Sequence, residues 1–195
     1  MGIAIAGLAS DARVLSNFMK QQCLASKMTY GRPLQLERIV NRIGDRAQTN
    51  TQHYGKRPYG VGLLVAGVDE AGPHLFEFQP SGMTYEMVAC AIGARSQMAR
   101  TYLERHLDEF PDCDRDRLID HALRALKESL SQDRELTIDN TTVGVVGVGS
   151  EATKGKIDSF KLYDGQEVTA FLESANDATR TATEETAGES MEVDS

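Results

Sequence analysis

Patterns of apolar residues predict helices that come in consecutive pairs, with strands before, between and after the pairs. Recurrence of apolar side chains at helical spacing predicts four helices: 10–28, 36–47, 94–107 and 114–130. Apolar runs and alternation bounded by turn residues predict six strands: 2–8, 59–67, 74–78, 83–92, 141–148 and 159–163. A last helical turn is predicted at 168–172. Tight turns join the middle strands, which favours an antiparallel meander. We therefore expect an α+β fold in which helix pairs cover packed sheets, an αββα sandwich.

The first predicted strand has small apolar residues throughout, which is typical of a strand covered on both faces. It starts at Gly2, so no earlier segment of this sequence can pair with it. We therefore expect its pairing partner either to be missing from the chain or to be supplied from elsewhere. After the strand, Ser10 is a candidate N-cap, and Asp11 lies in the first helical turn, where its charge suits the helix dipole.

Length, hydropathy and cysteine content place the chain among globular proteins that keep their thiols reduced. The 195 residues are 41% hydrophobic, so one domain, or at most a small pair, with a real core is expected. No run of 18 apolar residues occurs, and the apolar start lacks the basic flank of a secretory signal. The cysteines, Cys23, Cys90 and Cys113, are few and widely spaced, which argues against disulfides and structural zinc. These features predict no membrane partner and a location in cytoplasm or nucleus.

The net charge of −8 is concentrated at the carboxyl end of the chain. Ser174 to Ser195 contains six acidic residues and one arginine, with Met191 and Val193 as its large apolar residues. Such a segment cannot offset the entropy of ordering, so 174–195 is expected to be a disordered acidic tail. Residues 1–173 are nearly balanced in charge and lack the basic footprint of nucleic-acid binding. A nucleic-acid partner is therefore not expected.

A search for catalytic, cofactor and metal motifs predicts no such site. Gly60, Gly62 and Gly67 are similar to part of a dinucleotide loop, but they lie inside a strand pattern with no helix following. The four histidines share no metal-ligand spacing, and no nucleophile elbow occurs. A nucleotide-binding enzyme therefore remains a minor alternative.

Two clusters of arginine and tyrosine are candidates for a protein interface. One lies in the loop before the second strand, and the other lies on the third helix, where Arg95 is expected in the first turn. A cation there opposes the helix dipole, so we expect an acidic partner for Arg95. A solvated helix face is the alternative, because many surface charges contribute little. Arginine and tyrosine are nevertheless enriched at interfaces. The candidate interface residues are Arg57, Tyr59, Arg95, Arg100, Tyr102 and Arg105.

Three ordered motif groups resemble the α-type subunits of the proteasome, over about residues 1–172. The first is the strand and helix start, the second is the central hairpin, and the third opens the third helix. In order they comprise Gly2–Leu8 with Ser10–Arg13, Arg57–Gly67 with Gly72-Pro73 and Gln79–Gly82, and Ala91–Gln97 with Thr101–Arg105.

The resemblance implies a fold, a role and a set of partners. The fold is the αββα sandwich of N-terminal-nucleophile hydrolases. The role is that of a non-catalytic structural subunit of the α ring, which supports assembly and gated ubiquitin-dependent protein degradation by the β subunits. The partners are other α and β subunits, in a heteroheptameric α ring stacked on a β ring, and regulatory particles at the α-ring surface. No cofactor is implied, and the location is cytoplasm and nucleus.

The sequence also departs from this family. Family members have a gating tail, a helix and two strands before the position of Met1. The α-type domain, residues 1–173, is therefore expected to be truncated at its N-terminus. The alternative function is a self-contained amidase of the same fold class. That enzyme requires a threonine, serine or cysteine at a processed N-terminus, and Met1-Gly2 offers none.

Overall fold

The computed structural model describes residues 1–131, 134–148 and 157–175. Its contacts divide the chain into two compact units. The first unit comprises Met1–Ser96 with Gly144–Lys161. The second comprises Gln97–Val143 with the residues from Leu162 onward.

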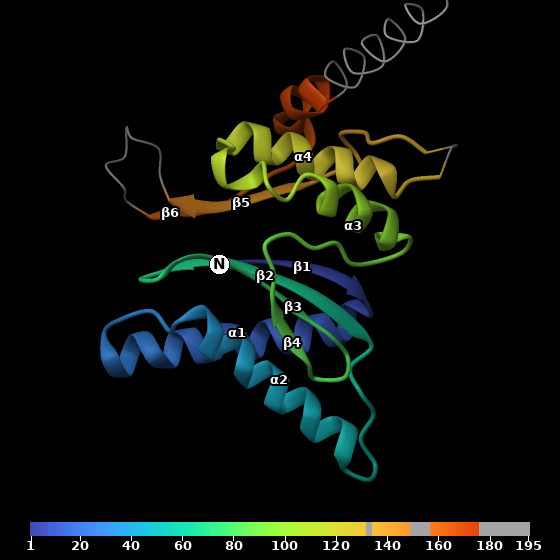
Figure 1. The fold of residues 1–195 in the computed structure, drawn as a ribbon. Helices are drawn as coiled ribbons and strands as arrows, with labels where there is room; N and C mark the ends of the chain where they lie inside the picture. Colours follow the sequence, from blue (N-terminus) through green and yellow to red (C-terminus); the bar gives the residue numbers. More distant parts are fainter. Residues whose placement is uncertain (132–133, 149–156, 176–195) are drawn as a thin grey trace, which may run out of the picture. The chain divides into compact units, whose positions relative to one another are not determined.

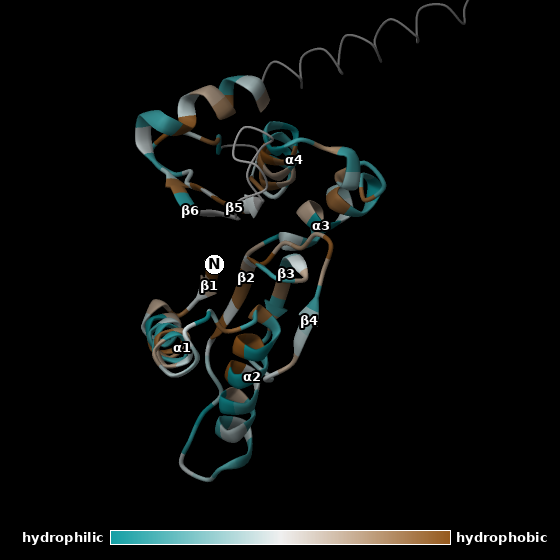
Figure 2. Cartoon of the chain, turned by 90° about the vertical axis from the view of Figure 1, so that its left-hand side faces the viewer, coloured by the Kyte–Doolittle hydropathy of each residue, from teal (hydrophilic) through white to brown (hydrophobic). Residues whose placement is uncertain are grey.

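The first unit is built on a four-stranded sheet with a pair of helices on one side of it (Figure 1). The helices and strands of its Met1–Ser96 segment are β1 (Gly2–Gly7), α1 (Ala9–Tyr30), α2 (Leu36–Gln52), β2 (Val61–Asp69), β3 (Gly72–Phe78) and β4 (Thr84–Glu86). The strands follow the order β1-β2-β3-β4, and each neighbouring pair is antiparallel. Figure 2 shows the same helices on the same side after a quarter turn. The predicted meander and the first helix pair are therefore confirmed.

The core of this unit lies between α1, α2 and the facing side of the sheet. Alternation along β2 buries every second side chain, because successive residues of a strand point to opposite faces. Leu63 and Val65 stand opposite Phe78 and Phe76 in the neighbouring strand. Fully burying one large apolar side chain stabilises a fold by about 1.5–3 kcal/mol. Side chains with no measurable exposure include Leu15, Met19, Val40, Ile43, Leu63 and Val65.

Strand β1 differs from the prediction of burial on both faces. It is an edge strand that pairs with β2, and Ala4 is exposed while Ile5 keeps 51% of its surface accessible. Within the described residues, no strand pairs with the other edge of β1. Small apolar composition indicated a covered strand, but the composition of a strand cannot identify what covers it.

A boundary of each of the first two helices and the fourth predicted strand also differ from the prediction. Helix α1 begins at Ala9, with Leu8 at the N-cap and no side-chain cap, so Ser10 is not the N-cap. Helix α2 continues five residues beyond Ala47, to Gln52. Of the segment 83–92, which was expected to form a strand, three residues pair with the sheet and form β4.

The middle of α2 packs unusually close to the turn between β3 and β4. A Cβ atom added at Gly44 lies 2.9 Å from the carbonyl oxygen of Gly82. Gly82 itself has a φ of +89°, a conformation that favours glycine. The two glycines therefore let a helix and a turn approach at backbone distance.

Replacing Gly44 with alanine is expected to destabilise the chain, although alanine is the better helix former. The added methyl group meets a backbone carbonyl that cannot rotate away, and overpacking of this kind costs about 1–3 kcal/mol. Urea unfolding of the full chain measures the change. Gly62→Ala is the control, because a Cβ there meets its nearest atom at 3.7 Å, an ordinary contact. Equal stability of wild type and Gly44→Ala contradicts the prediction.

The remaining elements are two helices, short turns and a two-stranded sheet. They are α3 (Ser96–Arg105), η1 (Phe110–Asp112), α4 (Arg115–Glu128), β5 (Val143–Val148), β6 (Ile157–Tyr163) and η3 (Gly165–Val168). Strands β5 and β6 pair with each other. The predicted cap of α4 is confirmed, because the Asp114 carboxylate accepts a hydrogen bond of 2.8 Å from the amide of Arg117. None of the helices in the described part of the chain is long and apolar enough to span a bilayer.

The expected acidic tail falls almost wholly outside the described residues. Residues 176–195 are among those the structure does not describe. Ser174 and Ala175 are helical, which corrects the predicted start of disorder at 174. The side chain of Ala175 is 5% exposed, so burial offsets the cost of ordering this residue.

Candidate functional site

The first candidate interface region, the loop before β2, is fastened to the start of α1 by one carboxylate. Arg57 Nη1 and Nη2 donate to Asp11 Oδ2 and Oδ1 at 2.7 and 2.9 Å. The amide of Gly60 donates to the same Oδ2 at 2.9 Å. In addition, the amide of Leu8 donates a backbone hydrogen bond of 2.9 Å to the carbonyl of Gly60. Asp11 therefore fixes the path of the loop.

These donors keep Asp11 ionised. The Arg57 guanidinium, with the amide of Gly60, lowers the pKa of Asp11 to about 2. Asp11 in turn raises the pKa of Arg57. Bidentate pairing of arginine and carboxylate is geometrically specific, so the loop conformation depends on both charges.

Replacing Asp11 with asparagine is expected to flatten the acid limb of the stability profile. Because folding lowers the pKa of Asp11, its carboxylate stabilises the fold at pH values above 3.8, the pKa in the unfolded chain. This contribution is lost as the pH falls toward the folded pKa of about 2. Asp11→Asn lacks that contribution at every pH. Urea unfolding of the full chain between pH 2 and 7 measures the profile. Arg57→Gln, which removes the main cause of the shift, is expected to flatten it partly, and an unchanged slope in both variants contradicts the assignment.

Tyr59 belongs to the core of the first unit and is 8% exposed. Its hydroxyl accepts a hydrogen bond of 3.0 Å from Nε of Arg46 on α2. The Arg46 guanidinium also lies 4.6 Å from the ring centroid of Phe18, in cation–π geometry. Tyr59 therefore anchors the loop to the core, whereas its neighbours from Tyr54 to Pro58 are exposed.

The second candidate region begins before α3, at Arg95. This residue precedes the helix and has a φ of 55°, so it does not lie in the first helical turn as predicted. The left-handed region is rare for residues other than glycine. The Arg95 side chain is exposed, and no acidic side chain among the described residues contacts it.

On α3 itself, Tyr102 is occupied by contacts within the second unit. Its hydroxyl lies 3.1 Å from Nδ1 of His121, and its ring stacks on His106 with centroids 4.3 Å apart. Arg100 is half-buried, and Arg105 is exposed at the end of the helix. Of the three candidates on α3, Arg105 is therefore the most accessible.

The histidine pair beside Tyr102 forms a packed polar cluster. Burial lowers the pKa of His121, although Glu109 lies 3.7 Å from its Nε2 and opposes this effect. His106 lies 4.0 Å from the same carboxyl group. Over residues 1–131, 134–148 and 157–175, no group of three or more histidine, cysteine, aspartate or glutamate side chains is arranged to hold a metal ion.

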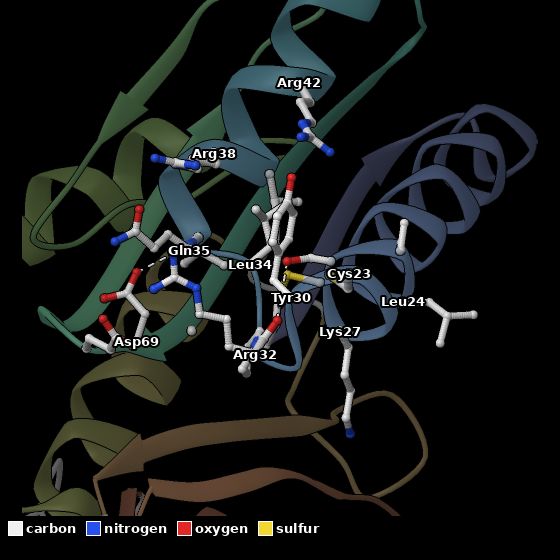
Figure 3. Close-up of a pocket in the computed structure, with 18 of the residues that line it drawn as sticks. Cys23, Leu24, Lys27, Tyr30, Arg32, Leu34, Gln35, Arg38, Arg42 and Asp69 are labelled. Carbon is white, nitrogen blue, oxygen red and sulfur yellow. Dashed lines mark hydrogen bonds between the residues drawn. The ribbon is translucent and has the colours of Figure 1, made fainter.

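A hollow of about 1070 Å³ lies where α1 ends and α2 begins (Figure 3). The turn between β2 and β3 forms its far wall, where the Asp69 carboxylate accepts a hydrogen bond from the amide of Leu36. Figure 3 shows Tyr30 over the hollow with its hydroxyl directed toward Arg42. The basic residues that line the hollow are Lys27, Arg32, Arg38 and Arg42. Sequence reasoning missed this surface because its walls come from segments distant in the chain.

Comparisons with known proteins agree with this architecture. The family model described as "Proteasome subunit" matches residues 1–146. The chain therefore belongs to the proteasome subunit family. It is 50% identical over 192 residues to "Probable proteasome subunit alpha type-6" of Schizosaccharomyces pombe, covering 95% of this chain and 68% of the relative.

Within that family, the chain is an α-type subunit. It is 49% identical to "Proteasome subunit alpha type-6" of Saccharomyces cerevisiae, over 88% of this chain and 70% of the relative. It is 46% identical to "Proteasome subunit alpha type-1" of Dictyostelium discoideum, over 76% of this chain and 60% of the relative. The resemblance seen in the sequence is confirmed. Subunits of this type are non-catalytic components of the protease complex, so the comparisons give no support to a self-contained amidase.

Proposed function

We propose that this chain is a non-catalytic structural subunit of the α ring of the 20S proteasome core particle. The observation that carries the proposal is about 50% identity to α-type subunits over nearly the whole chain. In this role the chain supports assembly, while β subunits perform gated, ubiquitin-dependent protein degradation. The helix pair on one side of an antiparallel sheet supports the αββα layering of this fold class.

The proposed partners are other proteasome subunits. We place the chain in a heteroheptameric α ring stacked on a β ring, with regulatory particles at the α-ring surface. The α-type domain comprises residues 1–173, and the acidic segment 174–195 follows it. We place the assembled particle in cytoplasm and nucleus, with no nucleic-acid or membrane partner and no cofactor.

The proposed contacts with neighbouring subunits use the two arginine- and tyrosine-containing regions. Arg57 and Arg105 are exposed, and Arg57 is held in one geometry by Asp11. An ordered, charged side chain loses little entropy on binding, which favours its use at an interface. Tyr59 and Tyr102 are proposed to hold the two regions in shape. The full proposed set is Arg57, Tyr59, Arg95, Arg100, Tyr102 and Arg105.

Expression of the tagged chain in fission yeast tests the assignment. We expect the tag to migrate with core particles on a native gel, and α and β subunits to co-purify with it. A charge-balanced tagged protein of similar size serves as the control for non-specific capture. Recovery of the tagged chain wholly as a free monomer, with native particles intact beside it, contradicts the proposal.

A further inference from the structure

His74 on β3 lies between two carboxylates that belong to different elements. Its Nδ1 is 2.5 Å from Oε1 of Glu86, the last residue of β4. Its Nε2 is 3.1 Å from Oδ1 of Asp69, the last residue of β2. One face of the ring stacks beside Phe76, with centroids 6.1 Å apart. The imidazole therefore bridges three strands of the first unit.

Asp69 extends this bridge to the start of α2. Besides His74, its carboxylate accepts hydrogen bonds from the amide of Leu36 at 3.2 Å and from the amide of Ala71 at 2.9 Å. Its side chain is 16% exposed, whereas that of Glu86 is 57% exposed. Asp69 is thus held by the backbone on two sides, and Glu86 can be hydrated when it is released.

The number of protons on the ring decides how many carboxylates it can bind. A protonated imidazole donates from both nitrogens, whereas a neutral imidazole donates from one and presents a lone pair at the other. With carboxylates at both nitrogens, a neutral ring directs its lone pair at one of them. That arrangement is repulsive, so one of the two contacts is lost on deprotonation.

We propose that His74 is a pH-dependent clasp, which when protonated fastens β4 to the β2–β3 hairpin and on deprotonation releases the Glu86 side. The Asp69 side is retained, because two backbone amides already hold that carboxylate beside the ring. The charged groups that face the ring are Asp69 from β2 and Glu86 from β4. The release loosens β4, which is three residues long and ends at Glu86.

The electrostatics set the direction of the response. The hydrogen bond with Glu86 raises the pKa of His74, partial burial opposes this, and Asp69 adds to the rise. Burial alone would raise the pKa of Asp69, but the hydrogen bonds from the amides of Ala71 and Leu36 and the charge of His74 outweigh it. The pKa of Asp69 is therefore lowered. A histidine whose pKa is raised by folding contributes stability. This contribution is fully present below the pKa of the unfolded chain, 6.5, and it is lost as the pH rises through the pKa of the folded chain. The clasp is therefore closed at mildly acidic pH and opens on the alkaline side of 6.5.

Amide hydrogen exchange of the full chain measures the clasp directly. The reporter is the amide of Met87, which donates to the carbonyl of Leu75 at 2.8 Å, just beyond Glu86. After correction for intrinsic rates, we expect its protection factor to fall about threefold between pH 6 and 9, a modest change because Glu86 is partly hydrated. In His74→Gln, protection is expected to be low and independent of pH. His53→Gln is the matched control, because His53 contacts its own helix at the Thr49 carbonyl.

A second measurement needs no histidine replacement. Titration of the His74 ring by NMR is expected to give a midpoint above 6.5 in the wild type and a lower midpoint in Glu86→Gln. The proposal is overturned by a wild-type midpoint at or below 6.5, by the same midpoint in both proteins, or by a pH-independent Met87 protection factor in the wild type. Protection in His74→Gln that follows pH as in the wild type also overturns it.

Discussion

Replacing Phe78 with alanine is expected to lower the free energy of unfolding by about 3–5 kcal/mol, among the largest effects of any single substitution in this chain. The ring is 1% exposed and belongs to the core between the sheet and the two helices. Truncation removes the transfer free energy of the ring and leaves a cavity that close-packed neighbours fill only in part. Urea unfolding of the full chain measures the difference.

Tyr85 provides the matched control for this prediction. It is an aromatic residue on the adjacent strand β4, but 41% of its surface is exposed. Tyr85→Ala is therefore expected to cost less than about 1 kcal/mol. If both variants lose the same stability, the helix-covered face of the sheet is not the core.

Reversing the charge of Arg105 is expected to reduce incorporation of the chain into core particles by about tenfold or more. The prediction rests on the proposed α-ring function and on the exposure of this side chain at the end of α3. Leaving a charge unpaired in an interface costs about 2–5 kcal/mol, and each 1.4 kcal/mol is about tenfold in affinity. Native gels of cells that express Arg105→Glu measure the incorporated fraction, and Arg95→Glu is expected to act in the same direction.

Arg13→Glu is the control for charge reversal. Arg13 is exposed on α1 and lies outside the proposed interface set. Circular dichroism of each variant establishes that folding is retained. Undiminished incorporation of Arg105→Glu and Arg95→Glu, with folding retained, removes both arginines from the interface.

The order of elements could be predicted because local patterns determine it. Alternation along β2 and the helical spacing of Ile39, Val40 and Ile43 specify which face of each element is buried. The cap at Asp114 was equally local, since the carboxylate reaches the amide of Arg117 three residues later. Such features depend on a few neighbouring residues, and the sequence displays them directly.

Features that depend on distant residues could not be predicted. Asp11 suits the dipole of α1, but its main partner, Arg57, is 46 residues away in the sequence. Because Arg57 and Gly60 hold that carboxylate, the start of the helix is fixed by tertiary contacts, and Ser10 is not needed as a cap. The conformation of Arg95 is likewise set by its surroundings, because a left-handed backbone at arginine has no signal in the sequence.

The candidate surfaces were predicted in part. The sequence identified Arg57 and Arg105 by residue type, and both are exposed. It did not distinguish them from Tyr59, whose burial follows from packing between the sheet and α2. The hollow beside Tyr30 and the bridge at His74 were missed altogether. Each brings together residues from different helices or strands, which only the fold places side by side.

Peptide hydrolysis by the isolated chain and by particles captured on its tag is the most direct measurement of the central claim. We expect the full chain alone to cleave no peptide amide, and the captured particles to cleave it with activity that β-subunit inhibitors abolish. A purified, folded monomer that hydrolyses the peptide without other subunits contradicts the account.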